Sequence, residues 1–175
     1  MSISEKIKQN IREVPDFPMP GVNFKDITPI FENPELCEEI IQTFIQSTSQ
    51  KPDAVLGIES RGFLFGFLLA NRLHVPFILA RKAGKLPYKT IKAEYQLEYG
   101  SSAIEINEGS IRRGQRILIH DDLLATGGTA MAAAQLVLHH NAVVSDFTFI
   151  IELSFLRGKE KLKNITNNII CLSTY

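Results

Sequence analysis

The sequence predicts an α/β fold with a mostly parallel sheet and helices on both faces. Apolar runs at residues 54–58, 75–80, 115–119 and 143–151 have the length and composition of buried strands. Helical patterns separate most of them, and strands that alternate with helices are typical of a parallel sheet. A chain of 175 residues has the size of one domain. We therefore expect a single domain over residues 1–175.

Two helices are expected before the first of these strands. Ser2 and Glu5 have the spacing of a capping box, and isoleucines then recur every four residues. Prolines and a glycine at residues 15–21 end this helix and begin an irregular segment. Asn33 and Pro34 have the residue types of an N-cap and a first helical position. The apolar face of the second helix consists of Leu36, Ile40, Ile41, Phe44 and Ile45.

Two further helices, at residues 62–72 and 130–140, follow the first and third strands. Between the second and third strands the pattern differs. Residues 81–92 contain five cations and no acid, and residues 94–99 and 103–106 have the pattern of an antiparallel hairpin. An insertion of this length in a compact domain is usually functional. We predict that residues 82–106 form a flexible lid that closes over a polyanion; a solvated surface hairpin is the alternative.

Composition excludes several classes of function. The chain has 19 basic and 19 acidic residues, and this neutral balance argues against general nucleic-acid binding. Cys37 and Cys171 lack the spacing of a redox or metal motif, which favours two reduced thiols in a cytosolic protein. The N-terminal segment lacks the apolar core of a signal peptide, and no run approaches the roughly 20 apolar residues of a membrane span. We expect a cytoplasmic protein that binds neither nucleic acid nor membrane.

The most informative pattern is ILIHDDLLATGGT at residues 117–129. An apolar run precedes Asp121 and Asp122, small and hydroxyl residues follow at 125–129, and helix formers begin at Ala130. Backbone N–H groups at a helix N-terminus bind phosphate, and glycines let the anion approach closely. The acids beside this loop indicate a ligand that also carries hydroxyl groups. Neither common nucleotide-binding glycine motif occurs in the chain.

The segment resembles the phosphoribosyl pyrophosphate (PRPP) motif of type I phosphoribosyltransferases, most closely over residues 121–129. His120 departs from the resemblance, because such segments usually carry an apolar residue there, and we assign it no catalytic role. The resemblance implies that Asp121 and Asp122 bind the ribose 2′- and 3′-hydroxyls. It also implies that the 5′-phosphate is bound by Ala125, Thr126, Gly127, Gly128 and Thr129.

Four other segments narrow the resemblance to the adenine phosphoribosyltransferases. Residues 16–27, 59–66, 84–87 and 97–100 match that family in order and spacing, within a similarity that extends from about residue 12 to residue 161. The resemblance implies that residues 1–32 form a hood over the base. The implied adenine contacts are stacking by Phe24, an apolar contact from Leu123, and backbone groups of Asn23 and Lys25 at the purine edge.

The resemblance also implies the remaining roles. The pyrophosphate site would lie at the turn after the first strand, where the family often has an unusual backbone, and at the base of the lid. Glu98 would act as acid or base near the purine imidazole ring. Mg²⁺ would bind mainly through PRPP oxygens, so no residue is assigned as a metal ligand. The chain would form a homodimer. The pyrophosphate residues are Glu59, Ser60, Arg61, Arg81, Lys82 and Lys85.

The predicted reaction is adenine plus PRPP giving AMP plus pyrophosphate, a step of purine salvage. A phosphoribosyltransferase for hypoxanthine, xanthine or orotate is the first alternative, and the match at residues 16–27 argues against it. A PRPP- or purine-sensing regulator on the same fold is the second. The neutral charge of the chain and the presence of the lid segment argue against a regulator.

Overall fold

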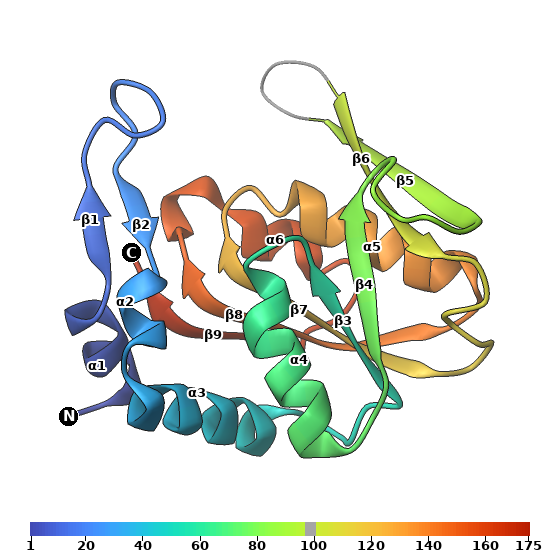
Figure 1. Ribbon diagram of the computed structural model, residues 1–175, viewed down its shortest axis with the longest axis horizontal. Coiled ribbons are helices and arrows are strands. Elements are labelled where there is room, and N and C mark those ends of the chain that lie inside the picture. The colour runs from blue at the N-terminus through green and yellow to red at the C-terminus, as the bar shows by residue number, and fades with distance from the viewer. Residues whose placement is uncertain (97–100) are drawn as a thin grey trace.

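The computed structural model describes residues 1–96 and 101–175, which form a seven-stranded sheet in the order β5-β6-β4-β3-β7-β8-β9 (Figure 1). The pairs β4–β3, β3–β7, β7–β8 and β8–β9 are parallel, so the predicted mostly parallel sheet is confirmed. β9 was not predicted from the sequence. The parallel strands are β3 (Ala54–Ile58), β4 (Phe77–Lys82), β7 (Arg116–Leu124), β8 (Val143–Glu152) and β9 (Ile169–Thr174).

Helices cover both faces of this sheet, as predicted (Figure 1). Side chains alternate along β3 and divide the core in two. Leu56 packs in the cluster under α5 (Gly128–His139), and Val55 packs in the cluster under α3 and α4. The helices on the second side are α1 (Ile3–Gln9), α3 (Pro34–Ser47) and α4 (Gly62–Leu73).

Local hydrogen bonds start the first and third helices where the sequence predicts. The Ser2 hydroxyl accepts from the Glu5 N–H at 3.3 Å, and the Glu5 carboxylate accepts from the Ser2 N–H at 2.7 Å. The Asn33 side chain accepts from the Leu36 N–H at 3.0 Å, with Pro34 in the first turn. Four of the five residues predicted for the apolar face of α3 are buried, and the fifth, Ile45, is partly buried.

The N-terminal segment is more regular than the sequence suggested. β1 (Arg12–Val14) pairs antiparallel with β2 (Phe24–Asp26), so only the residues between them are irregular. Each strand has three residues, too few for an alternating pattern to be visible in the sequence. Short elements were missed for the same reason: α2 (Thr28–Phe31), the 3₁₀ turn η1 (Ser154–Leu156) and α6 (Gly158–Leu162).

The predicted antiparallel hairpin is present. β5 (Thr90–Gln96) pairs antiparallel with β6 (Ser101–Asn107). β5 begins four residues before the strand predicted at 94–99, whose last three residues lie outside the described part of the chain, and β6 extends past both ends of the strand predicted at 103–106. β6 also pairs antiparallel with β4 through Arg81 and Lys82. The segment with five cations, residues 81–92, is therefore continuous with the edge of the main sheet. β4 extends two residues past its predicted end at residue 80.

His120 lies inside β7, whereas the strand predicted from the sequence ended at residue 119. β7 keeps its pairing with β8 as far as Leu124, which is why the strand continues past His120. The His120 ring is fully buried, and its Nδ1 lies 3.0 Å from the Thr148 hydroxyl. Burial lowers the pKa of His120 to about 3, so the ring is neutral at physiological pH.

Candidate active site

The loop between β7 and α5 lines a pocket at the carboxyl end of the parallel strands. Residues 123–130 line it together with Asp121 and Phe149, so all five residues predicted for the 5′-phosphate lie there. α5 begins at Gly128, two residues earlier than predicted, and Gly127 precedes it with a φ of 76°. The first N–H groups of a helix have no intrahelical partner. The pocket therefore offers free backbone donors and the positive end of a helix dipole to an anion.

Gly158, the first residue of α6, packs against this loop. A Cβ atom on Gly158 would overlap the carbonyl oxygen of Ala125 and lie 3.0 Å from the nitrogen of Gly127. A Cβ on Gly127 would in turn lie 2.9 Å from the Gly158 carbonyl oxygen. Two glycines thus allow the backbones to touch. Sequence reasoning missed Gly158, because no local pattern relates it to residues 125–127.

The two acids lie within β7, not after it as the sequence suggested. β3 stops pairing with β7 at His120, whereas β8 continues to Leu124, so the acids belong to a strand end that is paired on one side. The Asp121 carboxylate accepts from the Asp122 N–H at 2.9 Å. Burial and the neighbouring charge of Asp122 raise the pKa of Asp121 well above its ordinary value. Burial also raises the pKa of Asp122, and Arg61 opposes that rise.

Arg61 connects the acid pair to the N-terminal segment. It lies in the turn between β3 and α4, next to a cis peptide bond at Glu59–Ser60, so the turn has the unusual backbone that the resemblance implied. The Arg61 Nε is 2.9 Å from a carboxylate oxygen of Asp122. Its guanidinium also lies 5.1 Å from the centre of the Phe24 ring. Predicted base, ribose and pyrophosphate residues therefore meet at one point.

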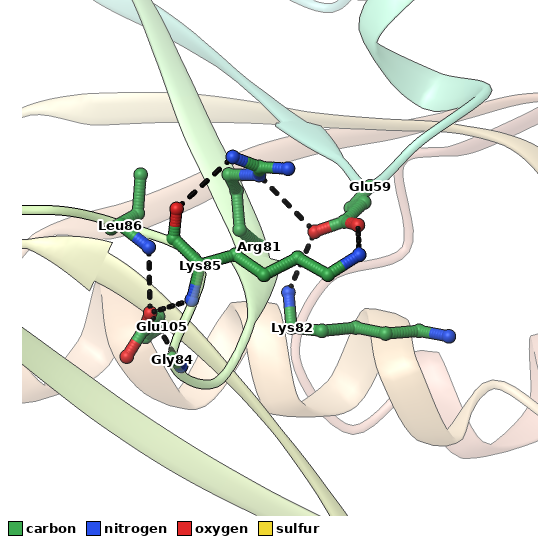
Figure 2. A network of polar contacts seen from close by, with 7 residues as sticks. All are labelled: Glu59, Arg81, Lys82, Gly84, Lys85, Leu86 and Glu105. Atoms are coloured by element: carbon green, nitrogen blue, oxygen red, sulfur yellow. Dashed lines mark hydrogen bonds and ion pairs between the residues drawn. The ribbon is translucent and has the colours of Figure 1, made fainter.

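Glu59 contacts the cations at the base of the hairpin (Figure 2). Its carboxylate lies 2.6 Å from the Lys85 Nζ and 3.3 Å from the Arg81 Nε, and accepts from the Lys82 N–H at 2.9 Å. The Lys82 side chain points away from the network (Figure 2). Burial alone would raise the pKa of Glu59, but the contacts with Lys85 and Lys82 hold it below its ordinary value. Glu59 therefore lies among the residues predicted to bind pyrophosphate, where it pairs with Arg81 and Lys85.

Asn23 and Lys25, which the resemblance places at the purine edge, make contacts that sequence reasoning missed. Lys25 is 8% exposed, forms an ion pair with Glu13 at 2.7 Å, and places its Nζ 4.4 Å from the centre of the Tyr175 ring. The Asn23 amide donates to Glu13 at 2.9 Å. Tyr175 follows β9, so the end of the described chain packs against β2. The side chains of both Asn23 and Lys25 are therefore paired with Glu13.

Two predictions fall outside these contacts. Glu98, the predicted acid or base, lies outside the described residues. Leu123, the predicted apolar contact of adenine, lines the pocket after β7 and packs against the core under α3 and α4. Within residues 1–96 and 101–175, no three His, Cys, Asp or Glu side chains form a group that could hold a metal ion. No helix in that same part of the chain is both long and apolar enough to cross a membrane.

Comparison with known protein families identifies the class of enzyme to which this fold and site belong. The family described as Phosphoribosyl transferase domain matches residues 26–168. The match spans Asp121 and Asp122, the pocket-lining loop at residues 125–129 and the cations at residues 81–92.

Individual relatives narrow the class. An adenine phosphoribosyltransferase of Cytophaga hutchinsonii is 45% identical over 174 residues, covering 99% of this chain and 96% of the relative. The crystal structure of the adenine phosphoribosyltransferase of Thermoanaerobacter pseudethanolicus is similar with a TM-score of 0.93 and 45% identity, covering 98% of this chain and 99% of that one. The Saccharomyces cerevisiae enzyme gives a TM-score of 0.88 and 41% identity, with 96% of each chain covered. The chain belongs to the adenine phosphoribosyltransferase family.

Proposed function

We propose that this protein transfers the 5-phosphoribosyl group of PRPP to adenine, giving AMP and pyrophosphate in purine salvage. One observation carries the proposal: Arg61 contacts both Asp122 of the acid pair and Phe24 of the hood, beside the phosphate loop. A base, a ribose and phosphate groups can therefore be bound side by side. The related Saccharomyces cerevisiae structure was determined with adenine and an imino-altritol bisphosphate.

The proposed roles follow the chemistry of each group. The 5′-phosphate binds to the N–H groups of residues 125–129. Asp121 and Asp122 accept hydrogen bonds from the ribose hydroxyls. Arg61, Arg81, Lys82 and Lys85 bind pyrophosphate, and a guanidinium can hold two of its oxygens at once. Glu59 and Ser60 shape this part of the site, with Glu59 holding the cations until the anion binds.

Adenine recognition is proposed for the hood. Phe24 stacks on the base, Leu123 contacts it from the other face, and backbone groups of Asn23 and Lys25 read its edge. A backbone carbonyl accepts from the C6 amine of adenine. The oxo group of hypoxanthine or guanine would place an acceptor against that acceptor and leave the buried carbonyl without a partner. The side chains of Asn23 and Lys25 are already paired with Glu13, which supports a backbone role.

Catalysis is proposed to come mainly from positioning and from stabilising charge. The family resemblance implies a loose transition state with positive charge on the ribose, and fixed groups that stabilise such charge lower the barrier most. Glu98 is proposed to exchange a proton with the purine imidazole ring. The carboxylate oxygens of Asp121 and Asp122 suit a hard cation, and Mg²⁺ is proposed to enter with PRPP, bound mainly by substrate oxygens. When bound, it offsets the charge of the leaving pyrophosphate.

A homodimer is proposed from an apolar surface on α4 and β4. Leu64, Phe67 and Leu68 of α4 are 48%, 57% and 46% exposed, and Leu79 of β4 is 39% exposed. Leu79 and Phe77 are two residues apart in β4 and so share a face, and the Phe77 ring contacts Phe67 at 5.9 Å. A second copy of the chain would cover this surface. Sedimentation equilibrium tests the dimer, and a monomeric wild type would contradict it.

The cytoplasm is proposed as the compartment. Cys37 and Cys171 are both free thiols in the structure, and the reducing cytosol keeps thiols in that state.

The first prediction concerns the choice of base. With PRPP and Mg²⁺, adenine is expected to give AMP. Hypoxanthine, guanine and orotate are expected to react at least about 100-fold more slowly, because none of them offers the C6 amine and the buried carbonyl would be left without a hydrogen-bond donor. The measurement is nucleotide formation with each base offered separately, with and without Mg²⁺. Turnover of another base in place of adenine would overturn the assignment of the hood. PRPP binding without turnover of any base would instead favour the regulator.

The second prediction concerns Glu98. Glu98→Gln is expected to lower kcat about 100-fold with adenine, because general acid–base catalysis contributes on that order, and to leave the Kd of AMP unchanged. Glu94→Gln, an exposed position on β5, is the matched control and should behave as wild type. A kcat within about twofold of wild type would leave Glu98 without a catalytic role.

A further inference from the structure

The segment that follows β4 is folded around a buried carboxylate, Glu105 of β6. Glu105 is 1% exposed. One of its oxygens accepts three backbone N–H groups, from Gly84 at 2.9 Å, Lys85 at 3.1 Å and Leu86 at 3.1 Å (Figure 2). Consecutive N–H groups that converge in this way form an anion-binding nest. Here a side chain of the protein itself occupies the nest.

The second oxygen of Glu105 is also satisfied. It accepts from the Thr90 hydroxyl at 3.0 Å and lies 3.7 Å from the Lys92 Nζ. Burial alone would raise the pKa of Glu105, but the hydrogen bonds from Leu86, Thr90 and Gly84 hold it below its ordinary value. The carboxylate is therefore ionised at neutral pH, and its hydrogen bonds are of the strong, charge-assisted kind.

This arrangement determines where the neighbouring cations point. Lys85 contributes its backbone N–H to Glu105 and its Nζ to Glu59, so the two carboxylates hold opposite ends of one residue (Figure 2). The Arg81 guanidinium donates to the Lys85 carbonyl at 3.1 Å and lies beside Glu59. Residues 84–86 thus orient both cations. Glu105 is not among the residues that line the pocket after β7.

We propose that Glu105 is a positioning residue for the pyrophosphate half of the substrate: its buried carboxylate fixes residues 84–86 so that Lys85 and Arg81 are presented to pyrophosphate. The inference rests on the proposed function of these cations. Glu105 acts through the loop and does not touch the substrate. Ligands that carry pyrophosphate depend on this loop, whereas AMP, which lacks pyrophosphate, does not. If Glu105 had only a structural role, its substitution would lower the affinity for both kinds of ligand together.

Glu105→Gln tests the proposal, because it keeps the shape of the side chain and removes the charge. Charge-assisted hydrogen bonds are roughly twice as strong as neutral ones, so we expect the Kd of inorganic pyrophosphate and the KM of PRPP to rise about tenfold. The Kd of AMP and kcat should stay within about twofold of wild type. Isothermal titration calorimetry with pyrophosphate and with AMP supplies the two affinities. Glu108→Gln, an exposed glutamate beyond the hairpin, is the matched control and should change neither.

Equal weakening of pyrophosphate and AMP, or no change in pyrophosphate binding, would overturn the proposal. If Glu105→Gln does not fold, as judged by circular dichroism, Thr90→Val carries the same test. It removes one hydrogen bond to Glu105, and we expect the Kd of pyrophosphate to rise about threefold with AMP binding unchanged. An unchanged pyrophosphate affinity in that variant contradicts the proposal. AMP formation by wild type is measured first, so that failure of the proposed function is separated from failure of this inference.

Discussion

Gly158→Ala is expected to lower kcat/KM for PRPP at least about 100-fold and to weaken AMP binding to a similar degree. The new methyl group would overlap the Ala125 carbonyl oxygen and lie 3.0 Å from the Gly127 nitrogen. Since both atoms belong to backbone, neither can rotate away, and the phosphate loop must move. Displacing a binding group by about 1 Å can cost a hundredfold in rate. Overpacking of this kind also costs roughly 1–3 kcal/mol of stability.

The control for this variant is Gly114→Ala. Gly114 has a φ of +80°, and no atom lies within 4 Å of the position that its new methyl group would take. It precedes the amino end of β7, away from the site. The strained backbone should cost roughly 1–2 kcal/mol of stability, with no effect on AMP affinity. Kinetics with PRPP, calorimetry with AMP and thermal unfolding are measured on both variants. AMP binding at wild-type strength in Gly158→Ala would show that the contact with Gly158 does not determine the loop.

Asp121→Asn is expected to reduce activity at least about 100-fold and to raise the Tm of the free protein. The loss follows from the proposed role of the carboxylate on the ribose hydroxyls. The increase in Tm follows from the raised pKa of Asp121. Burial and the charge of Asp122 make the ionised form of Asp121 unfavourable in the folded protein. An asparagine amide can donate where the protonated carboxyl would. The contact between Asp122 and Arg61 is unaffected by this substitution. We expect the free energy of unfolding to increase by about 1 kcal/mol, which corresponds to roughly 2–4 °C in Tm.

The pH dependence of this gain follows from linkage. Because the folded pKa of Asp121 is raised, the folded state holds a proton that the unfolded state releases above about pH 3.9. The free energy of unfolding of the wild type therefore decreases as pH rises from that value through the raised folded pKa. The variant has no ionisable group at this position, so it does not show this decrease. The difference in Tm should be small near pH 4, grow with rising pH, and then become constant. A difference that shrinks as pH rises would contradict the prediction.

Asp53→Asn serves as the matched control for Asp121→Asn. Asp53 lies just before β3, at the opposite end of the strand from the site, and hydrogen bonds from Arg116 lower its pKa. Its ionised form is therefore favoured in the folded protein, and the same substitution should lower the Tm slightly at neutral pH. The effect should be small because the pair is exposed to solvent. Activity should remain at the wild-type level.

Much of the fold could be predicted because its causes are local. The Ser2 and Asn33 caps form between residues three positions apart, and both are present as predicted. The buried strands of the parallel sheet follow from apolar runs. The five residues assigned to the 5′-phosphate are contiguous in the chain, next to the two acids and the following helix. All five line one pocket.

The partners of the site residues could not be predicted in this way. Glu59 pairs with Arg81, and Glu105 binds the loop at residues 84–86, across about 20 residues of sequence in each case. The resemblance placed Glu59 in the pyrophosphate site, but no local pattern indicated its cation partners or the role of Glu105. Lys25 and its partner Glu13 come from strands too short to produce a pattern, and they pack against Tyr175 at the far end of the chain.

Local sequence alone therefore specifies most strands of the parallel sheet, the helix caps and the pocket-lining loop at residues 125–129. Each of these depends on hydrogen bonds or side-chain periodicity within a few residues. Three further properties arise only in the folded chain: Gly158 must be glycine, Glu105 holds the loop at residues 84–86, and Phe67 lies in an exposed apolar surface. They depend on which distant backbones come into contact once the sheet is formed, and no spacing within the chain encodes them.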